Sequence, residues 1–309
     1  MEKNSKNPLL LVTGASGMLG KALTRLLSEK YEVLGVSKRG LSGSRRCDLS
    51  VENEVRALVT SAKPALVIHT AAYSDVDGCE REPELAFGSN VLASKNLAKA
   101  CAQNGVPWIY VSTDYVFDGR KKTPYDESEA TGPVNIYGMT KWCGEYYALN
   151  GPVHSAVVRT SWLFGADNPA NFVNAILERL QKEKTVSVLD DQTDSPTYVK
   201  DLSAALLKIG EHLLACQAKD PQKPAHEIFH VCNAGAATRL EMTQRMKEWL
   251  HLPVKIEKAD RSQIKGRLAI RPAYVVMSTQ RYEKFAGAKM RPWQESLKEY
   301  VNEAVLCAS

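Results

Sequence analysis

The sequence predicts an α/β fold: a doubly wound parallel sheet with a smaller C-terminal lobe. Three observations predict it. Short apolar runs alternate with amphipathic stretches over roughly the first half of the chain, which is typical of strand–helix–strand units in a parallel sheet. The first apolar run ends in a turn rich in glycine, and the regular alternation loosens after Trp162.

The expected strands are apolar runs bounded by turn residues, the usual sequence of buried parallel strands. In order, they cover residues 9–12, 31–36, 65–70, 108–112 and 156–159. Helical spacing of apolar residues predicts helices over residues 18–30, 51–62, 83–104 and 135–150. Later helices are expected over 171–182, 198–215, 240–250 and 293–304, with strands over 185–188 and 228–231.

This organisation predicts a dinucleotide-binding domain over residues 1–162 and about 197–233. The substrate-binding lobe then comprises about 163–196 and 234–309. The strand over 228–231 is expected to return to the main sheet, and residues 217–225, with two prolines, are expected to form an exposed loop.

Composition excludes several classes of protein. The chain has 309 residues, 44% of them hydrophobic, and a net charge of +5, which suits a small anionic ligand at least as well as nucleic acid. We expect no nucleic-acid partner, because no basic run is interleaved with aromatics. Seven cysteines without a Cys-x-x-Cys pair argue against a disulfide framework or a zinc site and for a reducing compartment. No run approaches the roughly 20 apolar residues of a membrane span, so we expect a cytoplasmic protein, either a monomer or a homodimer.

The glycine-rich turn predicts a Rossmann-like dinucleotide site. Gly14, Gly17 and Gly20 lie between the first expected strand and the first expected helix. Glycines at this place allow a pyrophosphate to approach the helix N-terminus closely. An ordinary strand-to-helix turn is the structural alternative.

The end of the second expected strand indicates which nicotinamide cofactor is preferred. It reads Ser37-Lys38-Arg39, with two cations where a carboxylate would bind the ribose of NAD. We therefore predict NADPH, with NADH still possible, because Arg39 or Lys38 can neutralise a 2′-phosphate. A solvated basic turn is the alternative. Asp48 either accepts a hydrogen bond from the adenine amino group or caps the following helix.

Tyr137 and Lys141 form a Tyr-x-x-x-Lys pair, 24 residues after Thr113. Four residues apart on a helix, the two side chains share one face. We expect the ammonium of Lys141 to lower the pKa of Tyr137, so that the phenol gives its proton to a forming alkoxide. Thr113 would polarise the same carbonyl oxygen. Lys141 would also bind the nicotinamide ribose.

These residues, with several longer segments, resemble the dTDP-4-dehydrorhamnose reductases among the extended short-chain dehydrogenases/reductases. The segments are Ser112-Thr113-Asp114-Tyr115-Val116-Phe117-Asp118-Gly119, Asn135-Ile136-Tyr137-Gly138-Met139-Thr140-Lys141, Arg159-Thr160-Ser161-Trp162, Ala71-Ala72-Tyr73-Ser74-Asp75-Val76-Asp77 and Asp191-Gln192-Thr193-Asp194-Ser195-Pro196-Thr197. The resemblance implies reduction of the C4 keto group of a nucleotide-linked 4-keto-6-deoxy sugar, which gives dTDP-L-rhamnose.

The resemblance also implies roles for single residues. Thr113 and Asp114 would contact the sugar, and Trp162 would pack on it, although core packing is the alternative for Trp162. The residues implied to line the cofactor are Gly17, Met18, Leu19, Asp48, Leu49, Ala71, Ala72 and Tyr73. Arg271 is a candidate for the substrate's diphosphate, unless it belongs to a solvated charged face.

The chain departs from the family pattern at two places. Asp194 stands where the family usually has glycine, and Arg271-Pro272 is followed by an unusual segment, Ala273-Tyr274-Val275-Val276-Met277-Ser278. Both departures concern the sugar rather than the hydride chemistry. We expect no metal, since no ligand set can be assigned from the sequence.

Two other functions fit the same sequence. The beta subunit of methionine adenosyltransferase is similar along its length, binds NADP and regulates a partner without reducing a sugar. Epimerases and dehydratases of the same superfamily keep a tightly bound NAD. Asp114, beside Thr113, partly meets the acid that a dehydratase requires.

Overall fold

The computed structural model describes residues 7–168, 171–259 and 266–306. Its centre is a sheet of seven strands in the order β11-β6-β5-β4-β1-β2-β3, and every neighbouring pair is parallel. The strands are β1 (Leu9–Thr13), β2 (Glu32–Ser37), β3 (Arg45–Arg46), β4 (Leu66–His69), β5 (Trp108–Thr113), β6 (Ser155–Thr160) and β11 (His226–His230). The predicted fold class is confirmed, and β11 does return to the main sheet.

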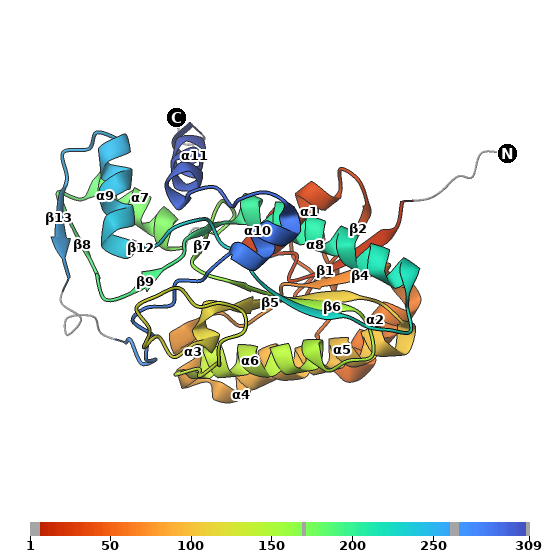
Figure 1. The fold of residues 1–309 in the computed structure, drawn as a ribbon. Helices are drawn as coiled ribbons and strands as arrows, with labels where there is room; N and C mark the ends of the chain where they lie inside the picture. Colours follow the sequence, from red (N-terminus) through yellow and green to blue (C-terminus); the bar gives the residue numbers. More distant parts are fainter. Residues whose placement is uncertain (1–6, 169–170, 260–265, 307–309) are drawn as a thin grey trace.

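Helices cover both faces of this sheet (Figure 1). One face carries α2 (Glu52–Ala62), α5 (Ala93–Asn104) and α6 (Ile136–Leu149), with the short α3 (Val76–Arg81) beside α6. The other carries α1 (Met18–Leu27) and α8 (Val199–Lys219). The order of strands reverses at β1, which lies between β2 and β4, and ligands bind at such switch points.

The helix expected over residues 83–104 is not continuous. Pro83–Ala86 forms α4, Phe87–Leu92 a π-helix, and α5 begins at Ala93. The π-helix carries Asn90, whose side chain accepts from the backbone nitrogen of Tyr73 at 2.8 Å and donates to Thr140 at 3.0 Å. The irregular turn thus fixes the loop after β4 to helix α6, as π-turns at functional sites often do.

The C-terminal elements pack beyond the carboxyl ends of the strands, at the left in Figure 1. They include the helices α7 (Phe172–Lys182), α9 (Arg239–Trp249) and α11 (Trp293–Leu306). Short strands pair beside them as β7 (Leu163–Phe164) with β10 (Thr197–Tyr198), β9 (Thr193–Asp194) with β12 (Ala237–Thr238), and β8 (Thr185–Val188) with β13 (Lys255–Lys258). One apolar core joins these elements to β1 and α1.

Two sequence expectations need correction in this part. Helix α8 continues to Lys219, so the exposed loop begins at Asp220 rather than at residue 217. A further helix, α10 (Gln280–Ala286), was not predicted. It packs on edge strand β11, where Phe285 lies 4.9 Å from the ring of Phe229, although residues 280–286 fall within the range predicted for the lobe.

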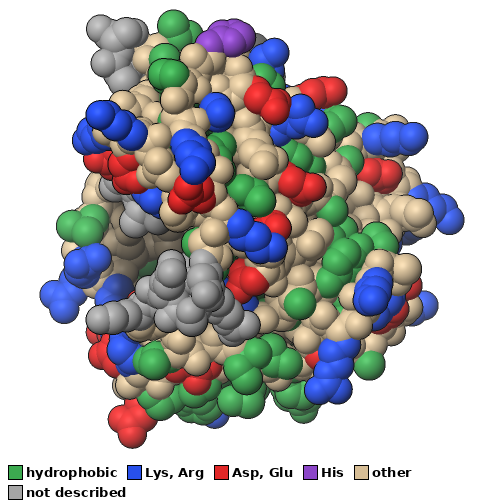
Figure 2. Space-filling view, turned by 90° about the vertical axis from the view of Figure 1, so that its left-hand side faces the viewer, with side chains coloured by type: hydrophobic (Ala, Val, Ile, Leu, Met, Phe, Trp, Pro, Cys, Tyr) green, Lys and Arg blue, Asp and Glu red, His purple; other side chains and the backbone are tan. Residues whose placement is uncertain are grey.

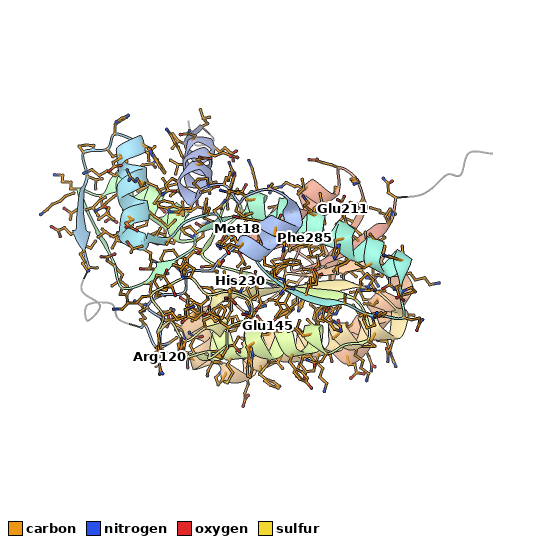
Figure 3. All side chains as sticks on the ribbon, in the orientation of Figure 1. Met18, Arg120, Glu145, Glu211, His230 and Phe285 are labelled. Atoms are coloured by element: carbon orange, nitrogen blue, oxygen red, sulfur yellow. The ribbon has the colours of Figure 1, made fainter. Side chains whose placement is uncertain are left out.

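A buried ion pair fastens α6 to the sheet. Glu145 of α6 accepts two hydrogen bonds from Arg159 of β6, at 2.8 and 2.9 Å, and a third from Ser112 of β5 at 2.6 Å. Figure 3 labels Glu145, between α6 and the sheet, and His230 of β11, which pairs with Arg159 on the neighbouring strand. Burial lowers the pKa of His230 to about 3, so this neighbour of Arg159 is neutral.

Charges are mixed on the surface that Figure 2 shows, where basic and acidic side chains are interspersed. None of the helices in the described part of the chain is both long and apolar enough to cross a membrane.

Removal of one partner of the buried pair should destabilise the fold strongly. We expect Glu145→Ala to lower the free energy of unfolding by about 3–5 kcal/mol, because it leaves Arg159 buried and unpaired. The matched control is Glu178→Ala, which breaks an exposed pair with Lys182 and should change it by less than about 1 kcal/mol. Urea unfolding measures both; equal losses would show that Glu145 does not anchor α6.

Candidate active site

A cleft of about 880 Å³ runs along the carboxyl edge of the sheet. The residues predicted to act on or bind ligands all line it: Gly14, Gly17, Met18, Leu19, Gly20, Ser37, Lys38, Arg39, Asp48, Leu49, Ala71, Ala72, Tyr73, Thr113, Asp114, Tyr137, Lys141, Trp162 and Arg271. Segments far apart in the sequence are thus brought to one site. Their individual roles stay predictions.

The glycine turn forms a cradle that excludes side chains. Gly14 has a left-handed backbone (φ +69°), and a Cβ there would lie 2.7 Å from the backbone nitrogen of Ala71. A Cβ on Gly20 would lie 2.1 Å from the carbonyl oxygen of Gly14. Gly17, the N-cap of α1, offers no side chain to the first amides of the helix. These amides and the positive end of the helix dipole suit the pyrophosphate of a dinucleotide.

The two basic residues after β2 differ in their contacts. Lys38 pairs with Asp48 at 3.0 Å, whereas Arg39 is exposed and forms no ion pair with a described residue. Asp48 accepts from the amide and the hydroxyl of Ser50, and it does not cap α2, whose N-cap is Val51. The capping alternative for Asp48 is therefore wrong. Arg39 is the better candidate for a 2′-phosphate.

Burial governs the protonation of Tyr137 and Lys141, which both belong to α6. Burial raises the pKa of the Tyr137 phenol, and a hydrogen bond with Thr113 only partly opposes the rise. The expectation that Lys141 lowers the pKa of Tyr137 is therefore wrong. Burial also lowers the pKa of Lys141 to about 7, and its Nζ donates to the carbonyl oxygen of Val111 at 2.7 Å. Desolvation is the largest cause of both pKa shifts, and neither side chain is among the main causes of the shift in the other. Tyr137 consequently keeps its proton at neutral pH.

Thr113 is held by its neighbours at the end of β5. Its hydroxyl accepts from the backbone nitrogen of Tyr115 at 3.2 Å and donates to Asp114 at 2.8 Å. A hydroxyl has one proton, so while Thr113 donates to Asp114 it presents a lone pair, rather than a proton, to the cleft.

Asp114 and Asp194 form a buried pair of carboxyl groups. Asp114 is 3% exposed and Asp194 is fully buried, and the hydroxyl of Ser161 lies between them. Burial raises the pKa of Asp114 to about 6. Burial and the nearby charge of Asp114 raise the pKa of Asp194 well above its usual range. Asp194 therefore holds a proton, and its interaction with Asp114 stabilises the charged form of the Asp114 carboxyl group and lowers its pKa.

Two residues lie where β6 ends and the C-terminal elements begin. Trp162 has a left-handed backbone (φ 37°), a conformation that costs about 1–3 kcal/mol and is concentrated at functional sites. The guanidinium of Arg239, the first residue of α9, lies 5.1 Å from the ring of Trp162 and 5.3 Å from that of Phe172. Arg239 lines the cleft, and the sequence analysis missed it. A lone arginine at the start of a helix gives no signal in the sequence.

Arg271 reaches the cleft but is already paired. Asp77, which follows the loop after β4, accepts two hydrogen bonds from it, at 2.8 and 3.2 Å. The same carboxylate accepts from the backbone nitrogens of Leu268 and Ala269. Arg271 is thus not part of a solvated face, and Asp77 already balances its charge; its role toward a diphosphate stays a prediction.

Comparison with known proteins gives a consistent result. Residues 8–306 match the family model described as RmlD substrate binding domain. A dTDP-4-dehydrorhamnose reductase of Mycolicibacterium smegmatis is 35% identical, over 96% of this chain and 86% of that protein. A dTDP-4-keto-6-deoxy-D-glucose reductase of Streptomyces niveus is 31% identical, over 94% of this chain and 95% of that protein. Among solved structures, the dTDP-4-dehydrorhamnose reductase of Bacillus anthracis in complex with NADP is 30% identical, with a TM-score of 0.85, covering 96% of this chain and 99% of that chain.

The carboxyl pair should make stability depend on pH. Asp194→Asn keeps a hydrogen-bond donor to Asp114 but binds no titratable proton. Above about pH 4 the folded wild type retains the Asp194 proton that the unfolded chain loses, so its free energy of unfolding falls as the pH rises. Relative to the variant it should fall by up to about 1.4 kcal/mol per pH unit, until the raised pKa of Asp194 is reached. Urea unfolding at pH 5, 6 and 7 tests this, and parallel curves would show that Asp194 is ionised in the fold.

Proposed function

The chain belongs to the RmlD substrate-binding-domain family, and we propose that it is an NADPH-dependent reductase of a nucleotide-linked 4-keto-6-deoxy sugar. The proposed reaction converts dTDP-4-dehydro-L-rhamnose to dTDP-L-rhamnose. The observation that carries it is the meeting of Tyr137, Lys141 and Thr113 with the glycine turn in one cleft. Reductases of such sugars among the relatives, and a related structure with NADP, support it.

The residues that would bind the cofactor all line the cleft. The turn at Gly14, Gly17 and Gly20 would hold the pyrophosphate, and Arg39 the 2′-phosphate. Other walls would come from Met18, Leu19, Ser37, Asp48, Leu49, Ala71, Ala72, Tyr73 and Lys141. NADPH, when bound, supplies the hydride that reduces the keto group.

Residues of this chain donate the proton that the reduction requires. Tyr137 donates its proton to the oxygen of the keto group as this oxygen becomes an alkoxide, which is a stronger base than a phenolate. The raised pKa of Tyr137 therefore does not oppose the proton transfer. It also keeps the phenol protonated at neutral pH, as a general acid must be. Thr113, whose hydroxyl donates to Asp114 at 2.8 Å, interacts with Tyr137, and we propose that this contact holds the phenol beside the keto oxygen.

Other parts of the proposal concern the whole molecule. We propose that residues 1–162 and about 197–233 bind the dinucleotide, and that about 163–196 and 234–309 bind the sugar nucleotide. The protein would work in the cytoplasm as a monomer or homodimer. The mixed charge of the face in Figure 2 favours a small anion over a nucleic-acid backbone as its ligand.

Loss of the phenol should abolish turnover without loss of cofactor. We expect Tyr137→Phe to lower kcat by about 100- to 10,000-fold, the usual contribution of general acid catalysis. NADPH oxidation at 340 nm with dTDP-4-dehydro-L-rhamnose measures it, and NADPH binding followed by fluorescence is the control. A wild type that binds NADPH and leaves the sugar unreduced would contradict the proposal and favour the regulatory subunit.

The preference for NADPH should depend on Arg39. Arg39→Ala removes a charge-assisted hydrogen bond to the 2′-phosphate, so the ratio of kcat/KM for NADPH to that for NADH should fall roughly 5- to 30-fold. Lys38→Ala is the matched control. Its effect should be smaller, because Lys38 is already paired with Asp48. An unchanged ratio in Arg39→Ala, or a wild type that prefers NADH, would show that this turn does not bind the phosphate.

A further inference from the structure

Arg239 is a cation in the cleft that the described chain does not neutralise. No ion pair joins it to any carboxylate of residues 7–168, 171–259 or 266–306, and its Nε atom is sealed from solvent without a hydrogen-bond partner. Burial accordingly lowers the pKa of this guanidinium, the reverse of what a paired arginine shows. The guanidinium of an arginine does not lose its proton in a protein, so Arg239 stays positively charged. Arg239 is partly exposed to the cleft, while its Nε is sealed from solvent without a partner. A partly desolvated cation without an ionic partner favours an anionic ligand.

The surroundings of Arg239 strengthen this preference for an anion. Two further arginines act on it with like charge, and both are engaged: Arg267 pairs with Asp191 at 2.7 Å and Arg271 with Asp77 at 2.8 Å. The acidic groups that attract it are Tyr115 and Asp194. Burial raises the pKa of each, so both are neutral near pH 7. Of these three arginines, Arg239 is therefore the one without an acidic partner among the described residues, and it can bind an anionic ligand.

The position of Arg239 selects the ligand. Its guanidinium contacts the rings of Trp162, just after β6, and Phe172, at the start of α7, so several elements hold it in place. It lies among the elements beyond the main sheet, whereas the anion sites expected for the cofactor are the glycine turn after β1 and the basic turn after β2. A planar guanidinium binds two phosphate oxygens at once.

We propose that Arg239 binds the diphosphate of the nucleotide sugar, the role for which Arg271 was the candidate in the sequence. This inference rests on the proposed function, which supplies the class of ligand. The diphosphate then completes the charge balance of the cleft, and the contacts with Trp162 and Phe172 hold the guanidinium ready before the ligand arrives. Arg239 is a binding and specificity residue and takes no part in the proton transfer.

The test measures binding without turnover. Thymidine diphosphate is titrated by calorimetry into wild type, Arg239→Gln and Arg245→Gln, each saturated with NADP. Arg245 is the matched control, because it lies on the same helix α9 in an exposed pair with Glu248. We expect Arg239→Gln to weaken thymidine diphosphate binding by about 10- to 100-fold, the size of a lost charge-assisted contact. The control should bind like the wild type.

A second readout separates binding from structure. Since Arg239 lacks a partner, Arg239→Gln should leave the Tm of the ligand-free protein unchanged or raise it, and thymidine diphosphate should raise the Tm of the wild type more than that of the variant. A clearly lowered Tm without ligand would instead make Arg239 a structural residue. Arg239→Lys keeps the charge but not the planar fork, so intermediate affinity is expected.

Three outcomes would overturn the proposal: a wild type that does not bind thymidine diphosphate, an Arg239→Gln variant that binds it equally well, or a variant that loses NADP affinity instead. Failure of the proposed reaction is a separate result. A protein that binds thymidine diphosphate through Arg239, yet reduces no 4-keto sugar, would leave this inference standing.

Discussion

The buried carboxylate of Glu145 fixes the helix on which the proposed catalytic side chains lie. Tyr137, Lys141 and Glu145 follow one another at intervals of four residues, so they share one face of α6. Glu145 binds Arg159 on β6 and Ser112 on β5. The helix cannot slide along the sheet without leaving these groups unpaired in the interior. The positions of Lys141 and Tyr137, one and two turns nearer the helix N-terminus, follow from this constraint.

Desolvation also determines which side chains of the cleft carry a charge. Near the end of β5 it favours neutral forms, because it raises the pKa of Tyr137 and Asp194 and lowers that of Lys141 to about 7. Tyr137 and Asp194 are therefore neutral near pH 7, and Lys141 loses part of its charge, whereas Asp114, with a pKa of about 6, stays largely ionised. Arg239 cannot lose its proton. The result is a reduced charge where the keto group is proposed to bind, and a persistent positive charge where the anionic part of the substrate is proposed to bind.

What the sequence predicted depends on short-range patterns. Apolar runs mark the strands, three glycines mark the turn after β1, and the four-residue spacing of Tyr137 and Lys141 needs only a helix. What it missed depends on contacts between distant residues. Asp77 and Arg271 are 194 residues apart, and nothing near either one indicates the other. The pKa of Tyr137 was predicted in the wrong direction for the same reason: the spacing reveals a neighbouring lysine but not the burial of both side chains.

The two departures from the family pattern are one feature in the structure. Residues 193–195, which include Asp194, pair with the unusual segment 273–277: Thr193 donates to the carbonyl oxygen of Ala273 at 2.9 Å, and Val275 donates to that of Thr193 at 3.1 Å. The hydroxyl of Ser195 accepts from the backbone nitrogen of Met277. This paired unit supports Asp194 behind Asp114, the residue expected to contact the sugar. A glycine at position 194 would remove the protonated carboxyl and release Asp114 from that partner. The difference from the family pattern thus lies behind Asp114, the proposed sugar contact, while the glycine turn and the Tyr-x-x-x-Lys pair are both present. This favours an effect on the choice of sugar rather than on the reduction itself.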